Sequence, residues 1–160
     1  MRPDTDTYFL RMAQLVATRS TCVRRAVGCV LVNARNHVVA TGYNGVPAGM
    51  PHCNHEKVYL PGPGKPPEII NPHACSGAAA PSGQQLDACM SVHGEQNALL
   101  QCGNVYEIDT CYVTHSPCIH CTKLLLNTSC RRIVYIHEYP HQAARDLWVA
   151  SGRLLEHGRP

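Results

Sequence analysis

The order of apolar and polar residues along the chain predicts helices and strands that alternate. Apolar residues recur at helical spacing over positions 6–18, which indicates a helix. Two apolar runs rich in β-branched residues follow at 26–32 and 37–42, and polar residues at 33–36 separate them. This order predicts a strand, a turn and a second strand.

The second half of the chain continues the alternation. In chain order, the pattern predicts a helix to about Cys102, a strand at 109–115, a helix to about Asn127, a strand at 132–137, a helix at 142–150 and a short edge strand at 153–156. The predicted fold class is α/β, in three α/β/α layers with a mixed central sheet of about five strands flanked by helices. A functional site is expected at the strand ends where two helices begin.

Residues 46–92 interrupt this alternation. They hold eight of the twelve prolines and little periodicity, and they are too long for a plain connection in a compact domain. A structural zinc site could order this insertion. Its candidate ligands are Cys22, Cys53, Cys75 and Cys89. Three histidines could each replace one of them: His52, His55 and His73. Because the spacings are irregular, unligated cysteines in a mobile loop are the alternative.

Composition sets the remaining bounds. A chain of 160 residues with 44% hydrophobic content predicts one domain, residues 1–160, with a proper core. The net charge of +3 is scattered, so neither nucleic acid nor a membrane is an expected partner. The N-terminus lacks the apolar core of a signal peptide, and no run of about 18 apolar residues occurs.

The ten cysteines therefore fit a reducing cytoplasm better than a secreted disulfide scaffold. Four of them lie within apolar segments and are expected to be small core residues: Cys29, Cys102, Cys111 and Cys130.

Two short motifs carry the candidate chemistry, His93-Gly94-Glu95 and Pro117-Cys118-Ile119-His120-Cys121. One imidazole and two thiolates suit zinc, and three protein ligands leave a fourth position for water. Glu95 follows the histidine by two residues, where it can exchange protons as a general acid and base. Alone, the cysteine pair could belong to a structural zinc ribbon or a redox site. In this order, the motifs match the pattern of zinc nucleobase deaminases.

Four segments together resemble the deoxycytidylate (dCMP) deaminase family, with the bacterial and phage late-competence type closest in pattern. They are RSTCVRRAVG at 19–28, TGYNGVPAG at 41–49, PHC at 51–53 and HGEQNAL at 93–99. The resemblance implies a cytidine-deaminase-like fold and hydrolysis of dCMP to dUMP and ammonia, which feeds thymidylate synthesis. It also implies a homo-oligomer, commonly a hexamer, that dCTP activates and dTTP inhibits, with Mg²⁺ accompanying a triphosphate effector.

The same resemblance implies roles for individual residues. His93, Cys118 and Cys121 would hold the catalytic zinc ion, and Glu95 would shuttle protons. The candidates for contacting the nucleotide are Asn44 for the sugar, Ser20 with Arg24 or Arg25 for the phosphate, and Tyr139 for closing the pocket. Arginines can clamp a phosphate through charge-assisted hydrogen bonds.

Two departures from the family leave alternatives open. Gly94 stands where the family usually has alanine, so a roomier pocket would suit 5-methyl-dCMP or 5-hydroxymethyl-dCMP. The uncharged stretch 78–81 lies where effector contacts often occur, so regulation by effectors is left open. Separately, dCTP is a further candidate substrate. An RNA- or DNA-editing deaminase is disfavoured by one Trp and one Phe for base stacking. A zinc protein that binds nucleotides without turnover is disfavoured by the presence of Glu95.

Overall fold

The computed structural model describes residues 1–50, 52–53, 57–59, 68–71, 77, 80–81, 84 and 88–160. Its elements, in chain order, are α1 (Thr5–Ala17), β1 (Gly28–Val32), β2 (Val38–Tyr43), β3 (Lys57–Tyr59), β4 (Glu68–Asn71), α2 (Gly94–Gln101), the 3₁₀ turn η2 (Val105–Glu107), β5 (Thr110–His115), α3 (Ile119–Leu126), β6 (Arg132–His137), α4 (Gln142–Ala150) and β7 (Leu154–His157).

Five strands form one mixed sheet in the order β2-β1-β5-β6-β7. The pairs β1–β2 and β1–β5 are antiparallel, whereas β5–β6 and β6–β7 are parallel. The parallel pairs need helical crossovers, which α3 and α4 supply. The α/β fold class with a mixed sheet flanked by helices is thereby confirmed.

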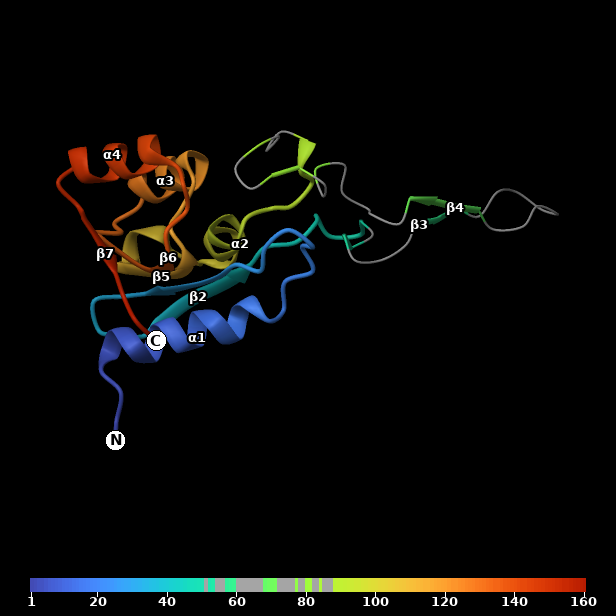
Figure 1. Ribbon diagram of the computed structural model, residues 1–160. Helices are drawn as coiled ribbons and strands as arrows, with labels where there is room; N and C mark the ends of the chain where they lie inside the picture. Colours follow the sequence, from blue (N-terminus) through green and yellow to red (C-terminus); the bar gives the residue numbers. More distant parts are fainter. Residues whose placement is uncertain are drawn as a thin grey trace.

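The helices cover both faces of this sheet. Helix α1 lies on one face, and α2, α3 and α4 lie on the other (Figure 1). On the α1 side, Phe9 and Leu10 pack against Val30 and Tyr112. On the opposite face, Trp148 belongs to a buried cluster that extends from α4 across the strands of the sheet to α2. The apolar strands therefore have helices on both faces, as their continuous hydrophobic runs require.

Two glycines allow helices to lie directly on strands. A Cβ atom at Gly28 would lie 2.1 Å from the carbonyl oxygen of Ala13 in α1. At Gly42 it would lie 2.2 Å from Ala98 N and from Gly94 O in α2. Both helices therefore contact the backbone of their strand, and this contact sets the height of α2 above β2.

The strand directions place one set of ends at a common edge. Since β1 runs antiparallel to β2 and β5, its first residue lies beside their last residues. An isolated bridge between Gly45 and Val92 brings the segment before α2 to this edge. Helix α3 begins there too, after the end of β5. Helix starts and strand ends therefore meet at one place, as the alternating pattern predicts.

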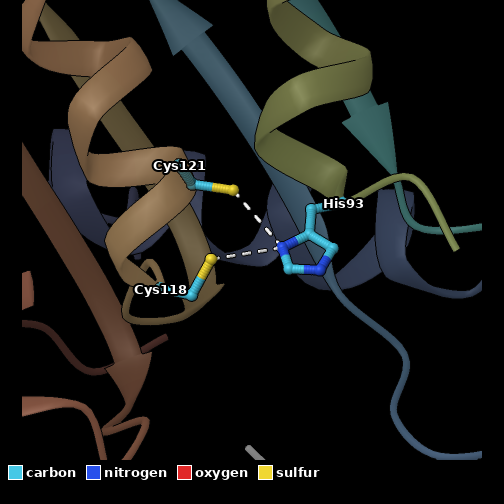
Figure 2. A group of neighbouring side chains, drawn as sticks. All are labelled: His93, Cys118 and Cys121. Atoms are coloured by element: carbon cyan, nitrogen blue, oxygen red, sulfur yellow. Dashed lines mark hydrogen bonds between the residues drawn. The ribbon is translucent and has the colours of Figure 1, made fainter. Parts of the chain in front are cut away.

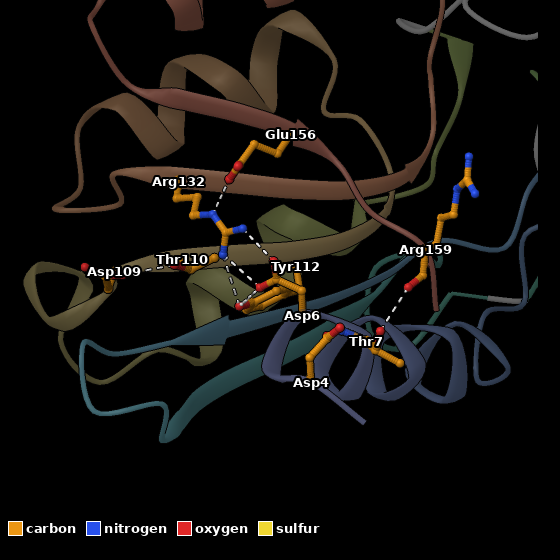
Figure 3. A network of polar contacts seen from close by, with 9 residues as sticks. All are labelled: Asp4, Asp6, Thr7, Asp109, Thr110, Tyr112, Arg132, Glu156 and Arg159. Carbon is orange, nitrogen blue, oxygen red and sulfur yellow. Dashed lines mark hydrogen bonds and ion pairs between the residues drawn. The ribbon is translucent and has the colours of Figure 1, made fainter. Parts of the chain in front are cut away.

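Arg132 joins α1 to two strands (Figure 3). Its Nη1 and Nη2 atoms donate to the two carboxylate oxygens of Asp6, at 2.8 and 2.6 Å. Its Nε donates to Glu156 in β7. The Tyr112 hydroxyl also donates to Asp6, at 2.7 Å. The hydrogen bonds from Arg132 lower the pKa of Asp6. This network fixes the N-terminal turn of α1 to the sheet.

Predicted and observed elements agree closely outside the insertion. The strand at 132–137 and the helix at 142–150 have the expected bounds, and the other elements shift by one or two residues. The pattern of residues 46–92 did not indicate β3 and β4, which form a separate two-stranded sheet. Strands of three and four residues are too short to show periodicity. That residues 1–160 form one domain stays a prediction.

Cysteines in the apolar segments lie as expected. Cys29, Cys111 and Cys130 are fully buried, and Cys102 is partly buried against the same core. Among the helices described, none has the length and apolar character needed to cross a bilayer.

We expect Asp6→Asn to lower the free energy of unfolding by about 1 kcal/mol at neutral pH, because the ion pair is partly exposed. Since the folded-state pKa of Asp6 is lowered, its stabilising effect is complete above the unfolded-chain pKa of about 3.9. That effect is lost as the pH falls through the folded-state pKa. Urea denaturation at pH 7 and pH 2.5 measures the difference.

Asp146→Asn is the matched control, because Asp146 is exposed and accepts one hydrogen bond from Gln142. It should change the unfolding free energy by less than about 0.5 kcal/mol. An equal loss for Asp6→Asn at both pH values would show that the charge of this pair does not stabilise the fold.

Candidate active site

Two helix starts bring three metal-binding side chains together. His93 precedes the first residue of α2, Cys118 precedes the first residue of α3, and Cys121 lies in the first turn of α3. The Cys118 and Cys121 sulfurs each lie 3.4 Å from His93 Nδ1 (Figure 2). All three ligand atoms lie within 4.8 Å of one another. His93 and Cys118 are 25 residues apart in sequence, and the fold brings the two motifs together.

Local hydrogen bonds fix these positions. The Gln96 side chain accepts from the backbone N–H of His93 at 2.8 Å, which holds the start of α2. Ser116 N–H donates to His137 O at 2.9 Å, and the Ser116 hydroxyl accepts from Tyr139 N–H at 2.7 Å. The turn between β5 and α3 is therefore tied to the end of β6.

The electrostatics favour a thiolate at Cys118. A hydrogen bond from Cys121 and the neighbouring His93 ring lower the pKa of the Cys118 thiol. The hydrogen bond with Cys118 raises the pKa of the Cys121 thiol. The hydrogen bond between Cys118 and His93 raises the pKa of the His93 ring. The positive end of α3 also favours negative charge on these sulfurs.

This donor set fits a zinc ion. Around a tetrahedral zinc ion, a nitrogen and a sulfur ligand lie roughly 3.6 Å apart, given typical bond lengths. The two observed nitrogen–sulfur distances of 3.4 Å are close to that value. Cys118 and Cys121 are buried, so few water molecules compete for the ligand positions.

Glu95 lies in the first turn of α2 and is 4% exposed. Burial raises the pKa of its carboxyl group to about 7. It lines the same cavity as His93 and Cys118. A carboxyl group at this place can both accept and return a proton near a metal ion.

The cavity has a volume of about 260 Å³. Besides the metal-binding side chains, it is lined by Arg24, Arg25, Asn44 and Tyr139. A buried carboxyl group, His93 and Cys118 of the zinc-type donor set, and two cationic side chains therefore line one cavity. Its chemistry suits a small anionic substrate.

Asn44 holds the arginine-bearing segment in place. Its Oδ1 accepts from Val27 N–H at 2.8 Å and lies 2.6 Å from the Ser20 hydroxyl. Its Nδ2 donates to Arg25 O at 2.7 Å. Asn44 is 6% exposed, so these hydrogen bonds satisfy a buried amide. The side chain therefore links the end of β2 to residues 20–27.

The two arginines differ in their contacts. Arg24 Nη2 donates to Pro81 O at 2.5 Å and to Gln84 O at 3.3 Å, so it reaches the insertion. The Arg25 guanidinium lies 5.1 Å from the centre of the Tyr139 ring, a cation–π distance.

The comparison with known families decides what kind of site this is. Residues 3–137 match the family described as the cytidine and deoxycytidylate deaminase zinc-binding region. The chain belongs to this family. The zinc-binding character of the site is therefore a property of the family as well as of the donor set.

Individual relatives agree with this assignment. The chain is similar to the deoxycytidylate deaminase of Mycobacterium phage D29, with 41% identity over 141 residues that cover 86% of this chain and 98% of the phage protein. It is 37% identical over 145 residues to that of Schizosaccharomyces pombe, with coverage of 86% of this chain. The chain spans 38% and 39% of the length of the fission and budding yeast relatives.

A solved dCMP deaminase from the cyanophage S-TIM5, in complex with dCMP and dUMP, has a similar fold. Its TM-score is 0.70 at 23% sequence identity, and the match covers 99% of each chain. At this identity the similarity supports the fold.

For this deaminase-family chain, the structure gathers most of the predicted site residues. Arg24, Arg25, Asn44 and Tyr139 line the cavity with the metal-binding residues. Ser20 is not among the lining residues described, and its hydroxyl is 2.9 Å from Asn44 O as well as 2.6 Å from Asn44 Oδ1. The hydroxyl also accepts from Cys22 N–H. Ser20 therefore contacts Asn44, and its predicted contact with the phosphate stays a prediction.

The predicted second zinc site lies partly outside the residues that the structure describes. Cys75 lies outside the described residues, as do His55 and His73. Within the described part of the chain, His93, Cys118 and Cys121 form the group of three that could hold a metal ion, and Cys22, Cys53 and Cys89 form none among themselves. Cys22 and Cys89 line the cavity. The second zinc stays a prediction.

The packing around Gly94 weakens the argument for a larger pocket. A Cβ atom at this position would lie 3.3 Å from Val27 Cγ1 and O and 3.4 Å from Gly42 O. The missing methyl group would therefore face Val27, just before β1, and the backbone of β2. Glycine here relieves close packing of α2 on the sheet.

His115 was not identified as a site residue from the sequence. It ends β5 and lines the cavity, three residues before Cys118. A histidine at the end of a strand just before a metal-ligand motif was the available signal.

We expect Gly42→Ala to destabilise the chain by about 1–3 kcal/mol, because the added Cβ meets backbone atoms of α2. To relieve this clash, α2 must move away from β2. This movement carries His93 and Glu95 away from α3, so the amount of zinc bound per chain should fall. Urea denaturation and metal analysis measure the two effects.

Gly103→Ala is the control, since an added Cβ at this position meets nothing within 4 Å in the described structure. It should retain the stability and zinc content of the wild type. If Gly42→Ala also retains both, the backbone contact between α2 and β2 does not position the site.

Proposed function

We propose that this chain hydrolyses dCMP to dUMP and ammonia, which supplies dUMP for thymidylate synthesis. The observation that carries the proposal is one cavity lined by His93 and Cys118 of the His-Cys-Cys donor set, by the buried Glu95 and by two arginines. The relatives named deoxycytidylate deaminases support the substrate, and the phage D29 relative matches over nearly its whole length.

In this proposal His93, Cys118 and Cys121 hold the zinc ion. When bound, zinc acts as a Lewis acid and lowers the pKa of a coordinated water molecule. The Nδ1 atom of His93 faces the two sulfurs, so it is the ring nitrogen that would bind the ion. The two helix starts orient these ligands.

Glu95 moves the protons. Hydrolytic deamination takes two protons in turn from the attacking water, places one on the ring nitrogen next to the reacting carbon and delivers the other to the amine, which leaves as ammonia. A single carboxyl group can perform these transfers in turn. The burial of Glu95 excludes bulk water, so the proton it accepts is delivered within the cavity.

Arg24 and Arg25 bind the phosphate group through their positive charges. Tyr139 holds the Arg25 guanidinium by its ring and closes the cavity on that side. Asn44 fixes residues 20–27 and has one remaining amide hydrogen for the sugar. Ser20 supports Asn44 by its hydroxyl contacts.

The resemblance extends the proposal to assembly and regulation. It supports a cytoplasmic homo-oligomer, with a hexamer favoured, and dCTP and dTTP as effectors with Mg²⁺. A second zinc ion held by Cys22, Cys53, Cys75 and Cys89 would order the insertion. Metal analysis per chain separates one zinc ion from two.

We expect Glu95→Gln to reduce kcat for dCMP by about 10³-fold, because an amide cannot accept the proton. Zinc content should remain that of the wild type. An assay of dUMP formation with metal analysis on the same sample measures both quantities. Cys118→Ser should lose zinc and activity together.

Glu107→Gln is the matched control, since Glu107 is an exposed residue of η2 away from the cavity lining. It should leave turnover unchanged. Survival of normal turnover in Glu95→Gln would overturn the role of Glu95.

The substrate is tested by comparing kcat/KM for dCMP, 5-methyl-dCMP, dCTP, deoxycytidine and a tRNA. We expect dCMP to be preferred. Arg25→Met should lower kcat/KM for dCMP by about 10- to 100-fold, because a phosphate contact to a charged group is lost, and leave deoxycytidine turnover unchanged. Preference for the methylated nucleotide or for tRNA would contradict the proposed substrate.

A further inference from the structure

His115 occupies a place in the cavity that the zinc motifs do not explain. It is the last residue of β5 and lies beside His137 of β6, with ring centres 4.9 Å apart. Arg25 lines the same cavity. His115 therefore lies where a bound nucleotide would contact it. The ring tautomer determines whether His115 presents a donor or an acceptor to that nucleotide.

Two consecutive hydrogen bonds through Thr114 indicate which tautomer the His115 ring adopts. Gly28 N–H donates to Thr114 Oγ1 at 3.2 Å. Thr114 Oγ1 in turn lies 3.1 Å from His115 Nδ1. The amide of Gly28 can only donate, so the threonine oxygen acts as acceptor in the first bond. The hydroxyl hydrogen of Thr114 is then left for an acceptor.

That acceptor is the histidine ring. Thr114 is 4% exposed, and a buried hydroxyl hydrogen without an acceptor is costly. His115 Nδ1 lies 3.1 Å from this hydroxyl, and it can accept the hydrogen when the ring carries its own hydrogen on the other nitrogen. When Nδ1 of a neutral imidazole accepts, the ring hydrogen resides on Nε2. Nε2–H is then a hydrogen-bond donor.

The surroundings keep the ring neutral. Burial, the charge of Arg25 and the neighbouring His137 lower the pKa of His115 to about 4. The ring is therefore uncharged near neutral pH, and the threonine decides which nitrogen carries the hydrogen.

We propose that His115 donates a hydrogen bond from Nε2–H to an oxygen atom of the bound nucleotide, and that Thr114 is the positioning residue that fixes this tautomer. This inference rests on the proposed dCMP deaminase activity. The acceptor is either a phosphate oxygen or an oxygen of the nucleoside. A donor at fixed geometry would favour a substrate with an oxygen at that place.

The first test is independent of turnover. NMR of the full chain labelled with ¹⁵N-histidine distinguishes the two ring tautomers, and His115→Gln identifies the His115 signals among the ten histidines. We expect the Nε2–H tautomer in the wild type and in Thr114→Ser, which keeps the hydroxyl. Thr114→Val, which removes it, should give a mixture.

Thr110→Val is the matched control. Thr110 lies at the other end of β5, is equally buried at 4% and donates to Asp109. Its loss should leave the His115 tautomer unchanged. The Nδ1–H tautomer in the wild type, or an unchanged tautomer in Thr114→Val, overturns the role of Thr114.

The second test measures kcat/KM on dCMP and deoxycytidine. His115→Phe keeps the ring shape without a donor and should lose about tenfold or more for dCMP. His115→Gln should recover part of the loss, because its amide N–H lies near the position of Nε2. A loss confined to dCMP assigns the acceptor to the phosphate, and an equal loss on both substrates assigns it to the nucleoside.

Wild-type rates for His115→Phe on both substrates would overturn the contact with the nucleotide. If the wild type itself turns over neither substrate, the proposed function fails. The NMR result still decides whether Thr114 sets the tautomer in that case.

Discussion

The contact between α2 and β2 is the constraint on which the site depends. At Gly42 the strand has no side chain, so the backbone of α2 lies directly on it. The start of α2 carries His93 and Glu95, and their height above the sheet follows from this contact. Only at that height can His93 face the two sulfurs that α3 presents. A packing detail of the sheet thus determines whether three donors can share one ion.

The rest of the cavity is built by hydrogen bonds to backbone groups. Asn44 links the end of β2 to the segment that carries both arginines. Thr114 links the start of β1 to the ring of His115. In both cases a buried polar side chain satisfies backbone groups at the open edge of the sheet. The same side chains then orient residues that line the cavity, so the fold and the site use one set of interactions.

Periodicity and motif spacing predicted much of this structure because they report on local and chemical constraints. The strand at 132–137 and the helix at 142–150 follow directly from their apolar patterns. The clustering of His93 with Cys118 and Cys121 follows from their ligand chemistry. The short strands β3 and β4 could not be predicted, since three or four residues carry no periodic signal.

Contacts between distant segments were also beyond the sequence. Nothing in the sequence pairs Asn44 with Ser20, or Thr114 with Gly28, because these hydrogen bonds depend on strand register. Whether His93, Cys118 and Cys121 hold a zinc ion is tested most directly by anomalous diffraction at the zinc edge from crystals of the intact chain. We expect a peak about 2.3 Å from the sulfurs of Cys118 and Cys121 and about 2.0 Å from His93 Nδ1. Crystals of protein that deaminates dCMP but shows no metal at this place would contradict the account.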